Sequence, residues 1–162
     1  TAADMLDADL PELLAQCLTT WRLPGSRLTL ELTESALLHN RTLALANMER
    51  LRALGCRLAL DDFGTGYSSL SYLVTLPVQE IKIDRSFVIA MEQSADARRV
   101  VRTIVDLASD LGMLPIAEGV ENDAAHAAVS ALGCQVGQGY LYGKPMPLAQ
   151  FIAWYRERYG NG

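Results

Sequence analysis

The sequence predicts an α/β fold in which about five parallel strands alternate with helices. Short β-prone segments and longer segments with helical periodicity follow one another along the whole chain, and this alternation is typical of a parallel sheet. The predicted strands are rich in apolar residues, which indicates a sheet that helices cover. In folds of this kind, functional groups gather at the carboxyl ends of the strands.

The amino-terminal quarter predicts one helix and one strand. A capping Asp9, an early Pro11 and a stripe of leucines predict a helix over residues 9–20. Residues 28–33 alternate apolar and polar side chains, as a half-buried strand does. We expect residues 1–4 to continue a strand and loop rather than to begin a domain.

The next segment predicts a helix over 42–54 that Gly55 ends, and then a strand over 56–60 that leads into Asp61. A short helix over 67–73 and a third strand over 80–83 follow. The leucines expected to face inward from the first of these helices are Leu43, Leu51 and Leu54.

The longest predicted helix covers residues 95–111, followed by a strand over 114–117. Asn122 is placed to cap a helix over 123–132. The last predicted elements are a fifth strand over 134–136 and a helix over 147–159. Along the longest helix the expected apolar face consists of Val100, Ile104, Leu107 and Leu111.

Composition restricts the class of protein. The chain of 162 residues is long enough for one domain with a core, and its net charge of −5 weighs against a nucleic acid polymer or an anionic membrane as partner. No apolar run approaches the ~20 residues of a membrane span. Three cysteines without CxxC spacing indicate neither disulfides nor zinc, so we expect a cytoplasmic protein. His39 and His126 are expected at the surface.

Asp61 and Asp62 stand side by side at the end of an apolar segment. Adjacent carboxylates raise each other's pKa, so burying them is costly unless a cation neutralises them. Gly64 and Gly66 follow and allow a sharp turn close to a ligand. The pair therefore predicts a metal site.

Every predicted strand delivers polar groups to the same edge of the sheet. Oxygen donors without histidine or cysteine suit Mg²⁺ or Mn²⁺, and two such ions can assist a phosphoryl displacement. Taken alone, Glu34 or Glu121 would equally suit a solvated loop. The set consists of Glu31, Glu34, Asp61, Asp62, Lys82, Asp84, Glu118, Glu121 and Gln138.

From the residues alone, several roles are open. Asp61 could bridge two ions, and Asp62 could bind the second. Lys82 could balance charge and position the attacking water. Glu118 could complete a metal shell or accept a proton, while Gln138 could hold the water or a phosphate oxygen.

Five segments together resemble the EAL-domain family of cyclic di-GMP phosphodiesterases, in the family's order and over nearly the whole chain. The double-Asp segment with its flanks is highly specific. The matching segments are Glu31-Leu32-Thr33-Glu34, the run from Asp61 to Leu70, Ile81-Lys82-Ile83-Asp84, the run from Ala117 to Glu121, and Gln138-Gly139-Tyr140.

The resemblance implies a modified TIM barrel that hydrolyses cyclic di-GMP to linear pGpG with two Mg²⁺ or Mn²⁺ ions. It implies that Glu31 and Asp61 bind the first ion, and that Asp61 and Asp62 bind the second. Lys82 and Glu118 would then serve the water and the second metal shell, with Gln138 in support.

Further roles follow from the same resemblance. Asp84 and Gln138 would contact the substrate, and Glu34 would anchor the loop that runs from Gly64 to Ser69. The region Gly64–Leu73 would form a homodimer interface.

The chain also departs from the family. It lacks the Glu-Ala-Leu motif and an Asn that would bind the first ion, and it predicts about five strands where a barrel has eight. We therefore expect residues 1–162 to be the C-terminal portion of a single EAL domain, a partial TIM-like barrel without its N-terminal strands. The parent would be a multidomain signalling protein, and the fragment alone would be inactive, with weak or no metal occupancy.

Three alternatives stay open. The parent domain could be a receptor that binds cyclic di-GMP without cleaving it. The chain could be a regulatory or dimerisation module. Another parallel barrel enzyme that acts on a phosphorylated metabolite would explain the acids at the strand ends, but not the Asp61–Leu70 segment.

Overall fold

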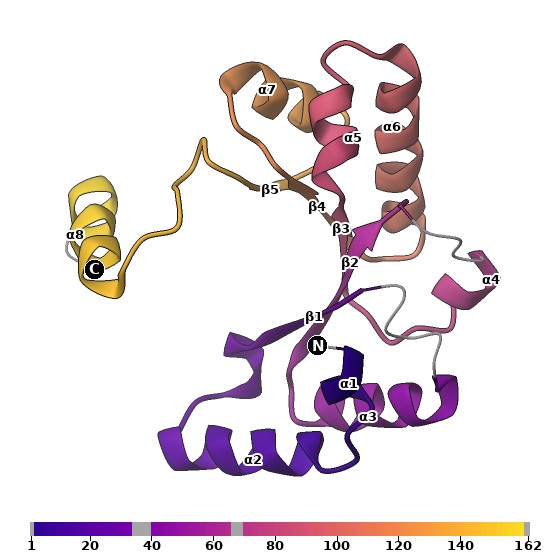
Figure 1. Ribbon diagram of the computed structural model, residues 1–162, viewed down its shortest axis with the longest axis vertical. Coiled ribbons are helices and arrows are strands. Elements are labelled where there is room, and N and C mark those ends of the chain that lie inside the picture. The colour runs from indigo at the N-terminus through magenta and orange to yellow at the C-terminus, as the bar shows by residue number, and fades with distance from the viewer. Residues whose placement is uncertain (1, 34–39, 66–69, 161–162) are drawn as a thin grey trace.

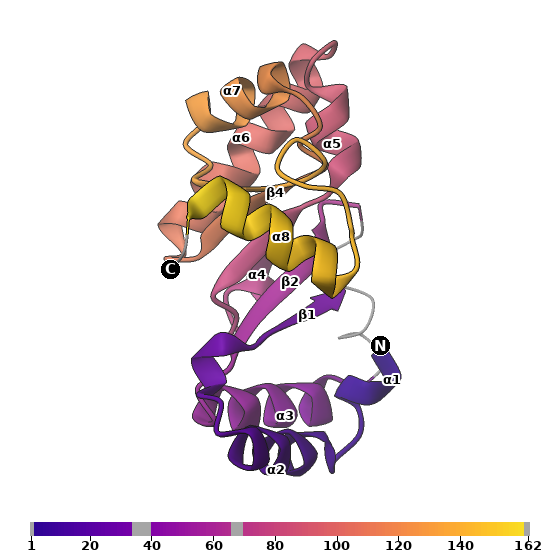
Figure 2. The ribbon, with the colours of Figure 1, turned by 90° about the vertical axis from the view of Figure 1, so that its left-hand side faces the viewer.

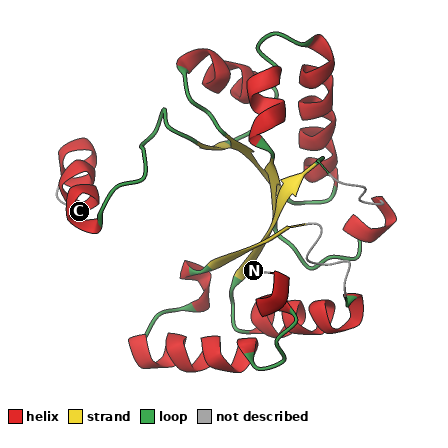
Figure 3. Cartoon of the chain, in the orientation of Figure 1, coloured by secondary structure: helices red, strands yellow, loops and turns green. Residues whose placement is uncertain are grey.

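The computed structural model describes residues 2–33, 40–65 and 70–160 and contains one parallel sheet. Its five strands lie side by side in chain order, β1-β2-β3-β4-β5, and form a curved, open sheet (Figures 1 and 3). This arrangement confirms the predicted α/β class and corresponds to part of a TIM-like barrel. The strands are β1 (Thr29–Thr33), β2 (Arg57–Phe63), β3 (Glu80–Ile83), β4 (Leu114–Glu118) and β5 (Val136–Gln138).

Helices cover one side of this sheet, except for the last helix. That helix, α8 (Leu148–Tyr159), follows an extended segment, stands away from the other helices (Figures 1 and 2) and has no buried residue. A 3-10 turn over Gly25–Arg27 precedes β1. The remaining helices are α1 (Ala2–Met5), α2 (Leu10–Trp21), α3 (Arg41–Ala53), α4 (Leu70–Leu73), α5 (Arg85–Ala90), α6 (Ala95–Asp110) and α7 (Asp123–Ala131).

The strand register separates an apolar face from a polar face. Residues paired in the register share a face, and successive residues alternate between faces. Ile81 and Ile83 of β3 are fully buried on the face that the helices cover, together with Leu58, Leu60 and Ala117 of the neighbouring strands. The opposite face carries Glu31, Asp61, Lys82, Glu118 and Gln138.

Most predicted elements agree with the structure to within about two residues. Asn122 does cap α7, because its side chain accepts a hydrogen bond from the Ala125 N–H at 2.8 Å. Of the helix predicted over 67–73, only the part from Leu70 onward can be compared, since residues 66–69 lie outside the described part of the chain.

The fifth strand was predicted two residues too early. It spans Val136–Gln138, and Cys134 lies in the turn before it, where its N–H bonds to the Val129 carbonyl at 3.1 Å. Cys134 is buried and its Sγ donates to the Pro115 carbonyl at 3.3 Å. The β-prone side chain of Cys134 therefore packs beside the sheet rather than in it.

The buried faces of two helices also differ from the prediction. In α6, Ile104 is buried as predicted and Leu107 and Leu111 are partly buried, but Val100 is 38% exposed. The other buried residues of α6 are Val101, Val105 and Ala108. In α3, Leu51 is buried as predicted, while Leu43 and Leu54 are only partly buried and Ala44 and Met48 face the core. In each helix one predicted residue, Leu51 or Ile104, lies on the buried face, and an alanine, Ala44 or Ala108, occupies another part of that face.

Two short helices were not predicted. Residues expected to continue a strand and loop form α1 (Ala2–Met5), which packs near α3. The second is α5, which Asp84 caps by accepting from the Ser86 N–H at 2.9 Å. None of the described helices is both long and apolar enough to cross a membrane.

A buried asparagine joins the amino-terminal segment to the domain. Asn47 of α3 is 1% exposed, and its amide donates to the carbonyls of Met5 and Asp7, both at 2.8 Å. Arg50 adds a hydrogen bond to the Ala8 carbonyl at 2.8 Å.

We predict that Asn47→Ala lowers the free energy of unfolding by about 1–3 kcal/mol, because two carbonyls lose their donor. Urea denaturation of the full-length protein measures this. Gln16→Ala, which removes only an exposed hydrogen bond to Glu12 within α2, should change little. Equal effects of the two substitutions would contradict the assigned role of Asn47.

Candidate metal and active site

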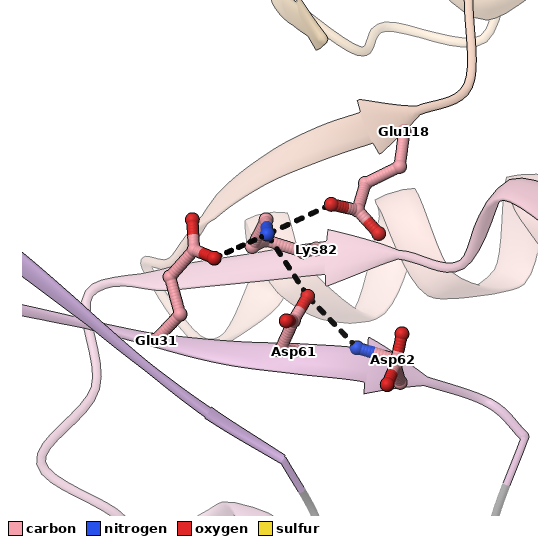
Figure 4. Close-up of polar contacts among 5 residues, drawn as sticks. All are labelled: Glu31, Asp61, Asp62, Lys82 and Glu118. Carbon is pink, nitrogen blue, oxygen red and sulfur yellow. Dashed lines mark hydrogen bonds and ion pairs between the residues drawn. The ribbon is translucent and has the colours of Figure 1, made fainter. Parts of the chain in front are cut away.

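Lys82 of β3 lies at the centre of the polar groups at the strand ends (Figure 4). Its side chain is 3% exposed. The ammonium Nζ lies 2.8 Å from Glu31 Oε2, 3.0 Å from Asp61 Oδ1 and 2.7 Å from Glu118 Oε1. These three carboxylates come from β1, β2 and β4, so a single cation contacts three other strands.

This environment fixes the charge of Lys82. Burial disfavours the ammonium, but hydrogen bonds to Glu118, Glu31 and Asp61 outweigh burial and raise the pKa of Lys82 above its ordinary value. Lys82 is therefore a permanent cation at neutral pH. It can orient an anion or a water molecule, but it is unsuited to accept a proton.

A bulge in β2 brings Asp61 and Asp62 to the same place. In a regular strand adjacent side chains point to opposite faces. Here the step from Leu60 to Phe63 on β2 opposes the shorter step from Ile81 to Ile83 on β3, so β2 contains one extra residue.

Asp62 accommodates the extra residue of β2 by adopting a left-handed backbone conformation (φ 54°). This conformation is uncommon for a residue other than glycine. Its N–H donates to Asp61 Oδ1 at 3.1 Å. This strained conformation keeps two carboxylates together at the strand end.

Three carboxylates are arranged as metal ligands. One oxygen from each of Asp61, Asp62 and Glu118 lies within 4.8 Å of the others. Together with Glu31 they give four carboxylates against the single ammonium of Lys82, a formal excess of three negative charges. Hard oxygen donors with surplus negative charge suit a divalent cation.

Burial and this surplus of charge both raise pKa values in the cluster. Burial, followed by the charges of Asp61 and Asp84, raises the pKa of Asp62 despite the opposing effect of Lys82. Burial also raises the pKa of Glu118; Lys82 opposes that shift, while Asp61 and Asp62 add to it. A cation bound here would relieve both shifts.

The other predicted site residues lie around this group. Gln138 is exposed at the end of β5, in register with Glu118 and on the same face of the sheet. Asp84 caps α5 through the N–H and hydroxyl of Ser86 and is partly exposed. Glu121 is exposed, and Glu34 lies outside the described residues.

One ion pair on the polar face was not predicted. Glu80 of β3 is 6% exposed and accepts from Arg57 of β2 at 3.2 Å, near the amino ends of these strands. The alternation of β3 places Glu80 and Lys82 on one face, and that signal could have indicated a partner for Glu80. Arg57 therefore compensates the buried charge of Glu80, and this ion pair lies away from the carboxylate cluster.

The fold and site define an α/β domain with a cluster of carboxylates around a buried lysine at the carboxyl ends of parallel strands. The chain belongs to the EAL domain family, whose model, described as "EAL domain", matches residues 1–145.

Several relatives carry functional names. The cyclic di-GMP phosphodiesterase RocR of Pseudomonas aeruginosa is 42% identical over 143 residues, which is 88% of this chain and 36% of RocR. The cyclic di-GMP phosphodiesterase PdeR of Escherichia coli is 38% identical over 157 residues, 97% of this chain and 24% of PdeR. The chain thus spans about a third or less of these relatives.

Solved structures agree in fold. The PaMucR phosphodiesterase in complex with c-di-GMP superposes with a TM-score of 0.88 at 40% identity, covering 93% of this chain and 61% of that one. Klebsiella pneumoniae BlrP1, in a manganese and cyclic di-GMP complex, has a TM-score of 0.79 at 31% identity, covering 85% of this chain and 35% of that one.

We predict that Asp62→Asn stabilises the metal-free protein at neutral pH. The raised pKa means that ionised Asp62 opposes folding, and Asn tolerates the left-handed backbone. The gain should be full above the folded pKa of Asp62. It should fade as the pH drops and vanish below about pH 4, where Asp62 is protonated in both states.

Chemical denaturation in EDTA at several pH values measures this gain. Asp106→Asn, an exposed change on α6 outside the cluster, is the matched control for replacing an aspartate by an asparagine. A loss of stability in Asp62→Asn at neutral pH would contradict the electrostatic account.

Proposed function

We propose that the domain to which this chain belongs hydrolyses cyclic di-GMP to linear pGpG with Mg²⁺ or Mn²⁺. The observation that carries the proposal is the cluster of Glu31, Asp61, Asp62 and Glu118 around buried Lys82. Relatives named cyclic di-GMP phosphodiesterases support the choice of substrate.

The donor set suits two divalent ions. Glu31 and Asp61 would hold the first, and Asp61, Asp62 and Glu118 would hold the second. The manganese complex of BlrP1 supports this kind of metal. When bound, such ions lower the pKa of a water molecule and neutralise charge on phosphate oxygens.

The side chains of this chain contribute binding and proton transfer. Lys82 orients the attacking water or a phosphate oxygen by donating hydrogen bonds. Glu118 would complete the shell of the second ion or accept a proton from the attacking water. Gln138 donates to the water or to a phosphate oxygen, and Asp84 contacts the substrate at the rim.

We also propose that the chain is the C-terminal portion of an EAL domain within a cytoplasmic, multidomain signalling protein. Glu31 lies on the edge strand β1 and is 48% exposed, which supports further ligands of the first ion beyond β1. The described chain alone would therefore be inactive.

A homodimer through Gly64–Leu73 is proposed as well, with Glu34 as the anchor of the loop. Residues 66–69 of that region lie outside the described part of the chain. Exposed Val74 beside α4 supports an apolar contact there. Sedimentation of the full-length protein tests the dimer.

A receptor that binds cyclic di-GMP without cleaving it is the second candidate. It is favoured by the direct pairing of Lys82 with three carboxylates, an arrangement that needs no metal to hold it together. Tight binding without linear product in Mg²⁺ would favour this candidate over the enzyme.

We predict that Asp61→Asn reduces hydrolysis of cyclic di-GMP in Mg²⁺ by more than about 100-fold. Groups that only support a metal ligand are worth about 10–100-fold, and the proposal makes Asp61 a ligand of both ions. Chromatography of the nucleotide products measures the rate, with Asp106→Asn as the unaffected control. Turnover that survives Asp61→Asn would refute the metal assignment.

Metal removal should abolish the same activity. EDTA should stop turnover, and excess Mg²⁺ or Mn²⁺ should restore it. In the absence of substrate, Mn²⁺ should raise the thermal midpoint of the wild type more than that of Glu118→Gln, because binding to the folded state stabilises it. Equal shifts in both proteins would exclude Glu118 as a ligand.

A further inference from the structure

The exits of β4 and β5 are joined through one buried residue. Val120, two residues beyond Glu118, donates its N–H to the Gln138 carbonyl at 3.0 Å. Its own carbonyl accepts from the Leu141 N–H at 3.1 Å. A Cβ on Gly139 would lie 2.2 Å from the Val120 carbonyl oxygen, so the segment after β5 closes tightly around Val120.

Strand β5 nevertheless has little support of its own. It has three residues and pairs with β4 alone among the described strands. Its central residue, Gly137, offers no side chain to the helix side of the sheet. Gln138 points to the opposite, polar face, in register with Glu118.

Tyr142 supplies the packing that Gly137 lacks. A Cβ on Gly137 would lie 2.5 Å from the Tyr142 hydroxyl and 3.1 Å from its ring carbons Cε2 and Cζ. The phenol of Tyr142 therefore occupies the position of the absent side chain and packs against the backbone of Gly137, the residue before Gln138.

His126 of α7 holds Tyr142 in this position. Its Nδ1 lies 2.9 Å from the Tyr142 hydroxyl, and the two rings meet edge to face with centroids 6.0 Å apart. Helix α7 is itself anchored by buried Ala125 and Val129. Burial, with a smaller effect of Cys134, raises the pKa of Tyr142, so its hydroxyl keeps its proton for this contact.

We propose that Tyr142, held by His126, is a positioning residue that fixes β5 and thereby places Gln138 beside Glu118. The proposal rests on the proposed hydrolysis of cyclic di-GMP. Tyr142 and His126 both lie outside the carboxylate cluster. They are on the side of β5 opposite to Gln138.

The test uses Tyr142→Phe and His126→Leu in the full-length protein, each alone and combined with Gln138→Ala. Tyr142→Phe keeps the ring on Gly137 and removes only the hydroxyl. With Gln138 present, each change should lower kcat about 2–10-fold, the range of one hydrogen bond, and leave KM nearly unchanged. In the Gln138→Ala background neither change should lower kcat further, because residues that act through one group are not additive.

Hydrogen exchange gives a second readout that needs no turnover. The amides of Val120 and Leu141, which bond across the two strand exits, should exchange faster in both variants. Tyr159→Phe, on exposed α8, should alter neither kcat nor these amides.

Equal losses of kcat with and without Gln138 would overturn the proposal, as would unchanged kcat and unchanged exchange. An inactive wild type would refute the proposed hydrolysis instead. The exchange rates would then decide on Tyr142 alone: faster exchange in the variants would support its role in holding β5, and unchanged exchange would overturn it.

Discussion

The buried ammonium of Lys82 is the interaction on which this site depends. A lysine that is 3% exposed would be costly without partners, and here carboxylates of three other strands surround it. Each carboxylate reaches Nζ only if its strand is in register. The site therefore needs the sheet in its present alignment, and the sheet tolerates four clustered acids because Lys82 is there.

The same geometry leaves the site electrostatically incomplete. Burial, together with neighbouring carboxylates that one ammonium does not balance, raises the pKa values of Asp62 and Glu118. The bulge and the left-handed backbone of Asp62 work against stability in the same way, since they hold like charges together. These unfavourable features at the ends of parallel strands are what the proposed divalent cations would compensate.

The sequence predicted the parallel α/β arrangement and the polar residues that gather around Lys82, because both depend on local patterns. Alternating or apolar runs marked β1 to β4, and each of these strands carries an acid or a lysine in its carboxyl-terminal part. The position of β5 was wrong because Cys134 resembles a strand residue locally, whereas its N–H bonds to the Val129 carbonyl at the end of α7 and the strand begins only at Val136. The bulge at Asp62 depends on how β2 pairs with β3, and the His126–Tyr142 contact joins residues 16 positions apart. Neither leaves a trace in a single segment.

A structure of the full-length protein with Mn²⁺, located by anomalous scattering, tests the central claim most directly. The account predicts manganese between Asp61, Asp62 and Glu118, at the roughly 2.0–2.2 Å expected for small divalent ions and carboxylate oxygens. Lys82 should stay in contact with the cluster. Carboxylates still gathered on Lys82, with manganese absent or bound elsewhere at saturating concentration, would contradict it.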